Sequence, residues 1–151
     1  MKWILFGMGG LTALVAVVAA IGSRLPRHHT ASRTLRVKRP PADVWAAVTG
    51  LTGASSVPVD VVESHPPFRL VTRVKETEKN FGGAWTITIV ADPSTGSGQG
   101  ATSLTITEDG WIANPIFRFM SRFVIGHHAS IDGILKPVAK ALNEEAVLSG
   151  K

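Results

Sequence analysis

The chain opens with an unbroken apolar run and then changes character. Trp3 to Gly22 is twenty residues without a charged side chain, and Thr12 carries the only polar one. An α-helix rises about 1.5 Å per residue, so this run is long enough to cross a hydrocarbon layer of roughly 30 Å. The pattern predicts a transmembrane helix over residues 1–22, with residues 3–22 in contact with the membrane.

A cleaved signal peptide is the alternative for this segment, and it would leave an exported domain. Ala20-Ile21-Gly22 offers small residues where a signal peptidase requires them. However, the basic region before the run is only Met1-Lys2, and the apolar run exceeds the usual length of about 7–15 residues. We therefore favour a retained, single-pass helix.

The positive charge of the chain is confined to this N-terminal region. The formal net charge is +5, yet residues 1–39 hold seven Lys or Arg and no acid, whereas residues 40–151 carry −2. Six of the seven basic residues follow the apolar run, so the positive-inside rule predicts a cytoplasmic domain. Residues 23–31 are typical of a basic juxtamembrane linker. Because the domain itself is mildly acidic, we do not expect nucleic acid as a partner.

Alternation of apolar and polar positions predicts strands in the rest of the chain. Turn-forming residues rather than helices join most of these runs, which indicates an antiparallel sheet. Pro58 near the start of the second run predicts an edge position. The five runs are Thr34–Val37, Val57–Glu63, Phe68–Glu76, Ala84–Val90 and Ser103–Ile112.

Helical periodicity appears in three places. The predicted helices cover residues 42–48, 114–124 and 130–143. Asn114 and Pro115 supply an N-cap and a first helical residue for the second helix. In the third helix, Pro137 predicts a kink, because it cannot donate a backbone hydrogen bond.

These elements predict one α+β domain. The C-terminal helical region is the only long element available to cover a face of the sheet. We therefore expect a curved antiparallel sheet wrapped around a long C-terminal α-helix, preceded by the transmembrane helix. The domain is expected to span residues 32–145, and residues 146–151 are expected to form a disordered tail.

Five segments in a fixed order carry a family resemblance. They are Pro-Pro-Ala-Asp-Val-Trp-Ala-Ala-Val (40–48), Pro-Pro-Phe-Arg-Leu-Val-Thr-Arg-Val (66–74), Gly-Gly-Ala-Trp-Thr (82–86), Thr-Ile-Thr-Glu-Asp-Gly (105–110) and Asn-Pro-Ile-Phe-Arg-Phe-Met-Ser-Arg-Phe (114–123). These segments resemble the START-like superfamily (SRPBCC proteins), which includes polyketide cyclase/dehydrase and lipid-transport-type proteins. The resemblance covers about residues 32–145 and implies the helix-grip fold, with a mostly apolar cavity between the sheet and the last helix. It implies an apolar ligand, either lipid-like or polycyclic, and no catalytic motif.

Aromatic and aliphatic side chains on the predicted inner faces are candidates to line the cavity, although they could equally fill it. The Phe-rich helix 116–124 has a wider apolar face than one packing contact requires, so it is also a candidate to gate the cavity and touch the membrane. The cavity-lining candidates are Phe68, Leu70, Trp85, Ile87, Ile106, Trp111, Phe117, Met120, Phe123, Ile131 and Leu135.

One carboxylate is a candidate for acid–base chemistry. Glu108 shares its parity with Leu104 and Ile106, so it can face inward, where burial would raise its pKa. The plainer interpretation is a residue at the rim, or a partner for Arg73 or Arg118. We therefore predict no catalytic residue and a non-enzymatic binding protein. A cyclase/aromatase-type enzyme, or an interaction domain with a filled pocket, are the alternatives.

No metal or cofactor is expected. His28 and His29 lie in the predicted linker, and His127 and His128 adjoin a helix start with Asp132 close by. Neighbouring histidines point in different directions, which leaves too few ligands for a metal site. The chain contains no cysteine, which excludes disulfides, thiolate metal sites, a cysteine nucleophile and a lipoprotein anchor.

Overall fold

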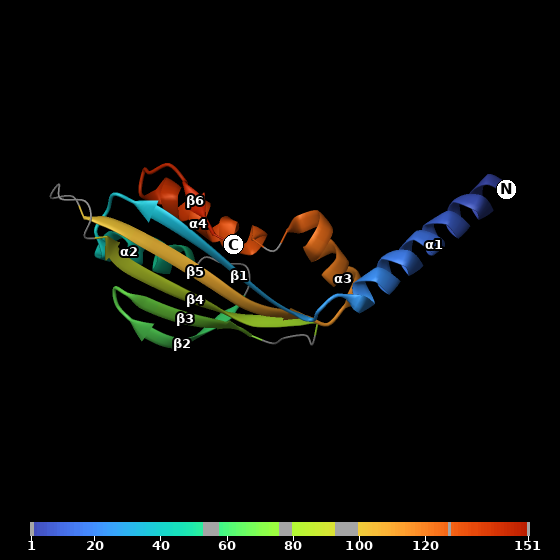
Figure 1. Ribbon diagram of the computed structural model, residues 1–151, viewed down its shortest axis with the longest axis horizontal. Helices are drawn as coiled ribbons and strands as arrows, with labels where there is room; N and C mark the ends of the chain where they lie inside the picture. The colour runs from blue at the N-terminus through green and yellow to red at the C-terminus, as the bar shows by residue number, and fades with distance from the viewer. Residues whose placement is uncertain (1, 53–57, 76–79, 93–99, 127, 151) are drawn as a thin grey trace.

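The computed structural model describes residues 2–52, 58–75, 80–92, 100–126 and 128–150, with side chains described from Met8 onward. The chain forms a six-stranded sheet, four α-helices and one short π-helix within these ranges (Figure 1). In chain order the elements are α1 (Lys2–Arg24), β1 (His28–Val37), α2 (Pro41–Thr52), β2 (Val59–His65), β3 (Arg69–Val74), β4 (Phe81–Asp92), β5 (Ala101–Ile112), α3 (Pro115–Met120), η1 (Ser121–Ile125), α4 (Ala129–Ala141) and β6 (Leu148–Ser149).

The sheet is antiparallel throughout, with strand order β2-β3-β4-β5-β1-β6. Helices α2 and α4 cover one face of it, and the core lies between (Figure 1). The predicted α+β fold, a curved antiparallel sheet around the C-terminal helix, is confirmed. The fully buried side chains include Leu35, Ile87, Ile89, Leu104 and Ile106 from the sheet and Ile131, Leu135 and Val138 from α4.

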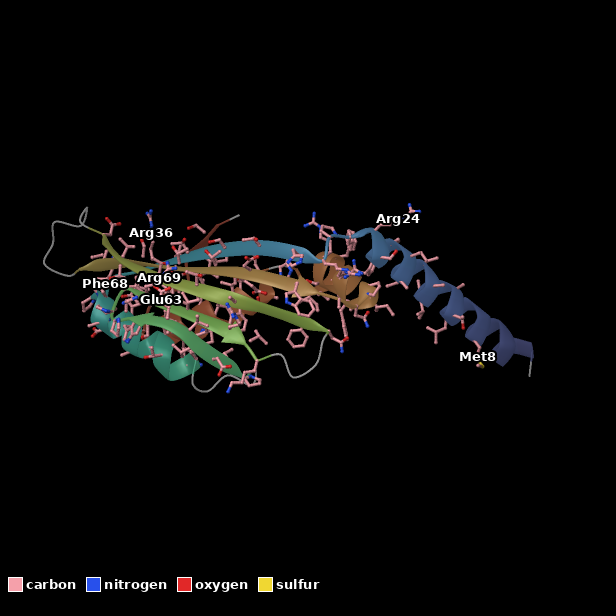
Figure 2. All side chains as sticks on the ribbon, turned by 90° about the horizontal axis from the view of Figure 1, so that it is seen from below. Met8, Arg24, Arg36, Glu63, Phe68 and Arg69 are labelled. Carbon is pink, nitrogen blue, oxygen red and sulfur yellow. The ribbon has the colours of Figure 1, made fainter. Side chains whose placement is uncertain are left out.

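Helix α1 extends away from the sheet (Figure 1). Figure 2 shows Met8 and Arg24 along it, with Phe68 at the opposite end of the molecule. The predicted N-terminal helix is therefore present. Within the described residues, however, no helix is both long and apolar enough to cross a membrane, so the predicted transmembrane span is not found.

The C-terminal end of α1 is docked onto α3. A Cβ atom on Gly22 would collide with the carbonyl oxygen of Pro115, so the two backbones touch where only glycine fits. Arg118 donates from Nη1 to the carbonyl oxygen of Leu25 at 2.8 Å and from Nη2 to that of Ala113 at 3.2 Å. These contacts fix the direction in which α1 leaves the domain.

Two predictions about the ends of the domain are wrong. Strand β1 begins at His28, inside the predicted linker 23–31, because its backbone pairs with β5 from His28 opposite Trp111 onward. The predicted disordered tail 146–151 contains β6, in which Leu148 pairs with Leu35 of β1 and packs against the core. Backbone pairing does not require alternating apolar side chains, so neither segment carried a strand pattern.

The edge strand β2 was correctly placed by Pro58, and it also contains a bulge. The register with β3 shifts between Val61 and Glu63. At the outer end of this pair, Arg69 Nε lies 2.9 Å from Glu63 Oε1 (Figure 2).

The Phe-rich segment is a helix of two kinds. Asn114 caps α3 as predicted, because its side chain accepts a hydrogen bond from the backbone N–H of Ile116 at 2.8 Å. The helix then continues as the π-helix η1 and ends at Gly126, whose φ of 86° suits glycine. Helix α4 runs through Pro137 to Ala141.

Candidate functional site

A pocket of about 230 Å³ lies between the sheet and helix α4, where the START-like resemblance places a ligand cavity. We call it the sheet–helix pocket. Side chains from α2, β2, β3, β4 and α4 form its walls, so elements far apart in sequence converge there. Its lining residues are Leu51, Thr52, Val59, Thr72, Trp85, Ile87, Gly133, Ile134 and Pro137.

Two buried polar atoms in this apolar pocket lack partners. Thr72 is 0% exposed, and neither its Oγ1 nor the Nε1 of Trp85 has a hydrogen-bond partner among the described residues. An unsatisfied buried donor costs about 1–3 kcal/mol. Such atoms are rare in native cores, so each calls for an explanation. A ligand carrying an acceptor oxygen in the pocket would satisfy both groups.

A second pocket of about 190 Å³ lies at the N-terminal end of α4 and contains Glu108. We call it the Glu108 pocket. The Glu108 side chain is only 16% exposed, and it faces inward as its strand parity predicted. His29 Nε2 donates to Glu108 Oε1 at 3.4 Å, and the Ser130 hydroxyl donates to Oε2. The cluster thus links β1, β5 and the first turn of α4.

The environment of Glu108 changes its pKa in the direction opposite to our expectation. Burial by itself raises the pKa of the carboxyl. Hydrogen bonds from His29 and Ser130, the nearby indole of Trp85 and the charge of a protonated His29 outweigh burial and lower the pKa below 4.5. The Trp85 indole N–H acts from a position too loose for a hydrogen bond. Glu108 is therefore a carboxylate at neutral pH, a weak base and no acid.

Gly110 allows His29 to reach Glu108. The two residues His29 and Gly110 are paired across β1 and β5, and a Cβ atom on Gly110 would lie 2.8 Å from Cε1 of the His29 ring. The ring therefore occupies the space that a side chain at position 110 would fill. His29 had been assigned to the linker, so sequence reasoning missed it. The glycine opposite a strand histidine was the one signal available.

The order of the cluster limits its chemistry. Glu108 stands in the middle, between His29 and Ser130, so Ser130 has a carboxylate rather than an imidazole as its partner. A serine nucleophile needs a general base that can take its proton, and a carboxylate with a lowered pKa serves poorly. The arrangement can orient a polar ligand group, or accept a proton from an acidic one.

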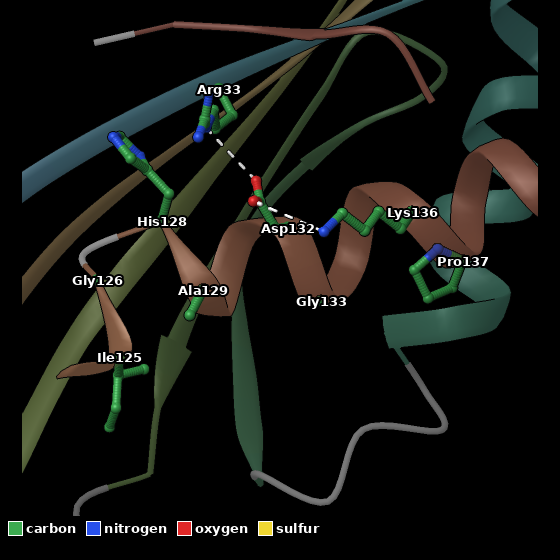
Figure 3. Close-up of a pocket in the computed structure, with 9 residues that line it drawn as sticks. All are labelled: Arg33, Ile125, Gly126, His128, Ala129, Asp132, Gly133, Lys136 and Pro137. Carbon is green, nitrogen blue, oxygen red and sulfur yellow. Dashed lines mark ion pairs between the residues drawn. The ribbon is translucent and has the colours of Figure 1, made fainter. Parts of the chain in front are cut away.

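An open groove of about 650 Å³ runs along α4 (Figure 3). Asp132 is flanked there by Arg33, whose Nε lies 3.4 Å from Oδ1, and by Lys136, whose Nζ lies 4.0 Å from Oδ2. Gly133 and Pro137 line both this groove and the sheet–helix pocket. The groove is open and its charges are largely paired, so we treat it as an approach to the enclosed pockets.

The predicted cavity-lining residues of the sheet and α4 lie in two places. Trp85 and Ile87 line the sheet–helix pocket. The others are packed in the core beneath it and are at most 4% exposed: Leu70, Ile106, Ile131 and Leu135.

The remaining candidates lie elsewhere, and their ligand contacts stay predictions. Phe68 is 55% exposed at the turn between β2 and β3, far from α1 (Figure 2). Trp111 is half-buried and lines the Glu108 pocket. On α3 and η1, Met120 is half-buried, whereas Phe117 and Phe123 are more than half exposed.

The part of the chain that the structure describes holds no group of three or more His, Asp or Glu side chains placed to bind a metal ion. His127 lies outside the described residues. Two other histidines near the predicted linker and helix start have different roles: His29 contacts Glu108, and His128 lines the α4 groove.

Comparisons with known proteins identify the fold. No family model matches the chain, and no curated protein matches it. A solved structure of a conserved protein from Geobacillus kaustophilus superposes with a TM-score of 0.50 and 12% identity, over 76% of this chain and 92% of that chain. The chain therefore shares its fold with that protein, and this fold agrees with the helix-grip architecture that the START-like resemblance implies.

Two aromatase/cyclase structures are also similar, at lower TM-scores. The ZhuI aromatase/cyclase from Streptomyces sp. R1128 gives a TM-score of 0.40 with 14% identity over 77% of this chain and 94% of that one. The di-domain ARO/CYC BexL from the BE-7585A biosynthetic pathway gives 0.41 with 13% identity over 95% of this chain and 60% of that one.

Proposed function

We propose that this protein binds an apolar small molecule with a hydrogen-bond acceptor in the sheet–helix pocket. The unpaired Thr72 hydroxyl and Trp85 indole N–H, buried in an otherwise apolar pocket, carry the proposal. Apolar walls supply affinity and a few polar groups fix orientation in most small-molecule sites. A lipid-like or polycyclic molecule with a carbonyl or ester oxygen has this chemistry.

Native mass spectrometry of the full chain, extracted in mild detergent, tests the proposal. We expect a co-purified apolar molecule, and displacement of the neutral probe Nile red by that molecule. Thr72→Val and Trp85→Phe should each weaken binding about tenfold, the effect of losing one buried hydrogen bond. Thr88→Val, on the opposite face of β4, is the matched control and should bind as the unsubstituted protein does. Equal binding by all four proteins would refute the proposal.

An enzyme of the cyclase/aromatase type is the second candidate, favoured by the inward carboxylate of Glu108 beside the sheet–helix pocket. In that case Glu108 accepts a proton from an acidic C–H or O–H of the bound molecule. Glu108→Gln would then leave binding intact and abolish proton exchange at that position, followed by NMR in D₂O. If Glu108→Gln does not change the rate of proton exchange, the enzyme hypothesis fails and the non-enzymatic binding protein, which we prefer, is the remaining interpretation.

We also propose that α1 holds the domain at a membrane. The twenty uncharged residues from Trp3 to Gly22 support this, as do the exposed side chains of Leu11 and Leu14, which are 63% and 60% accessible. An exposed apolar surface of this extent is typical of a site that contacts a membrane or another protein. On α3–η1, Phe117 and Phe123 would add a second contact, and tethering makes such weak contacts effective.

Carbonate washing of isolated membranes tests this location, and intact-mass measurement separates a retained helix from a cleaved signal peptide. A retained protein should stay with the membrane at its full mass. Protease added from the cytoplasmic side should digest the domain, since the basic residues after α1 predict that orientation. Recovery in the wash, or a mass lacking the N-terminal segment, would refute the anchor.

A further inference from the structure

A further pocket lies where α1 meets the domain, and it shares His29, Ile112 and Ser121 with the Glu108 pocket. We call it the junction pocket. It has a volume of about 340 Å³ and is formed by the connection between α1 and β1, the start of β1, the end of β5, and α3–η1. Its lining residues are Leu25, Pro26, Arg27, His28, His29, Ile112, Arg118, Ser121 and Arg122.

Arg118 is a buried cation in this pocket. The residue is only 7% exposed, and its two terminal nitrogens donate to the carbonyl oxygens of Leu25 and Ala113. The Nε–H is buried and has no hydrogen-bond partner among the described residues. No carboxylate of these residues forms an ion pair with it. A buried charge held only by neutral carbonyls is costly.

The other charged residues lining the pocket have the same sign. Arg27 and Arg122 are exposed, and neither forms an ion pair with a described residue. The lining contains no acidic residue, and His28 adds a possible donor. Three arginines therefore line the pocket with no acidic residue beside them in its lining, an electrostatic arrangement that favours an anion.

We propose that the junction pocket binds a phosphate group. A tetrahedral phosphate has enough acceptor oxygens to receive the Arg118 Nε–H together with donors from Arg27 and Arg122, which approach from different elements. Two sources share this chemistry: a phospholipid headgroup, and free phosphate or a small phosphate ester. Beside the pocket, Ile21 of α1 is 42% exposed and Phe117 of α3 is 56% exposed, which favours the lipid.

The site does not depend on the ligand of the sheet–helix pocket, because the two pockets share no lining residue. Occupancy of the junction pocket would supply the missing counter-ion of Arg118. A single ligand would also join the connection after α1 to α3 and η1.

NMR of the full chain in neutral detergent micelles tests the proposal. The reporter is the Arg118 Nε–Hε resonance, assigned with Arg118→Lys. The probes are dihexanoyl phosphatidic acid, dihexanoyl phosphatidylcholine, inorganic phosphate and, as a neutral lipid, dihexanoylglycerol. We expect the resonance to shift downfield with phosphatidic acid, and the neutral lipid to leave it in place. A response to phosphatidic acid alone assigns a lipid source, and an equal response to inorganic phosphate assigns a free one.

Three charge-matched variants decide whether the pocket is responsible. Arg27→Gln and Arg122→Gln should each weaken phosphate binding about tenfold, since each removes a charge-assisted hydrogen bond. Arg36→Gln removes the same charge from an exposed position of β1 outside the pocket and should bind normally. An equal loss in all three variants, or no shift of the reporter with any phosphate, would overturn the proposal.

Discussion

Trp85 on β4 and Glu108 on β5 stand directly opposite each other in the sheet. Trp85 lines the sheet–helix pocket and Glu108 lines the Glu108 pocket, so this cross-strand pair is the boundary between the two. A change in the charge of Glu108 therefore alters the electrostatic field at the Trp85 indole N–H, which we expect to donate a hydrogen bond to a ligand.

Glu108 should make the stability of the fold depend on pH. Its pKa is lowered in the folded protein, so its ionisation stabilises the fold at and above the ordinary value of 4.5, and that stabilisation is lost as the pH falls through the folded-state pKa. Glu108→Gln should cost about 1–2 kcal/mol at pH 7 and progressively less under acidic conditions. Urea unfolding at several pH values measures the difference. A constant difference across pH would contradict the assignment.

Two buried threonines offer a matched test of the unpaired hydroxyl. Thr72 and Thr102 are 0% and 1% exposed, but among the described residues only the Thr102 hydroxyl has a hydrogen-bond partner, donating to the carbonyl oxygen of Arg39 at 2.6 Å. Without ligand, Thr72→Val should raise the free energy of unfolding by about 1 kcal/mol, because an unsatisfied polar group is removed. Thr102→Val should lower it by about 1–2 kcal/mol. Thermal unfolding of both variants provides the comparison, and a loss of stability on Thr72→Val would show that its hydroxyl is satisfied.

Gly133 allows the pocket to be closed from α4. No atom lies within 4 Å of a Cβ placed there, so alanine fits and should stabilise the helix by about 0.5–1 kcal/mol. Gly133→Leu should instead extend into the space shared by the α4 groove and the sheet–helix pocket. We expect it to fold and to lose Nile red binding, whereas Gly133→Ala keeps it. Strong Nile red binding by both variants would show that the ligand binds elsewhere in the protein.

Gly22 tests the docking of α1. Gly22→Ala would push the new methyl group against the backbone of Pro115, so α1 must separate from α3. Gly10→Ala adds the same methyl group to the same helix with no atom within 4 Å and is the control. Trypsin should cleave at Arg24 and Arg27 faster in Gly22→Ala than in Gly10→Ala. Equal cleavage rates would show that the contact does not hold the helix.

The sequence predicted the centre of the sheet better than its ends. Strands β4 and β5 alternate clearly because one face packs on α4, and their inward residues Ile87, Leu104 and Ile106 were assigned correctly. The first half of β1 carries no such pattern. His29 and Arg33, inward by strand parity, contact Glu108 and Asp132, so polar partners replace the apolar face.

The site depended on relationships that sequence spacing does not contain. His29 and Glu108 are 79 residues apart, and only the register of β1 against β5 brings them together. The direction of the Glu108 pKa shift likewise depended on this partner, which had been assigned to a linker. By contrast, strand parity alone allowed Glu108 to face inward, although a position at the rim was the preferred interpretation.

The two outer strands have a consequence for how copies of the protein meet. At one edge, β2 is interrupted by its bulge and carries the exposed carboxylate of Asp60. At the other, β6 pairs with β1 only at Thr34 and Leu35. A sheet grows by adding strands to long, regular, uncharged edges, and the β2 edge does not offer one. Strand addition between molecules is thereby discouraged at that edge, which matters for a protein whose helix would gather many copies on one surface.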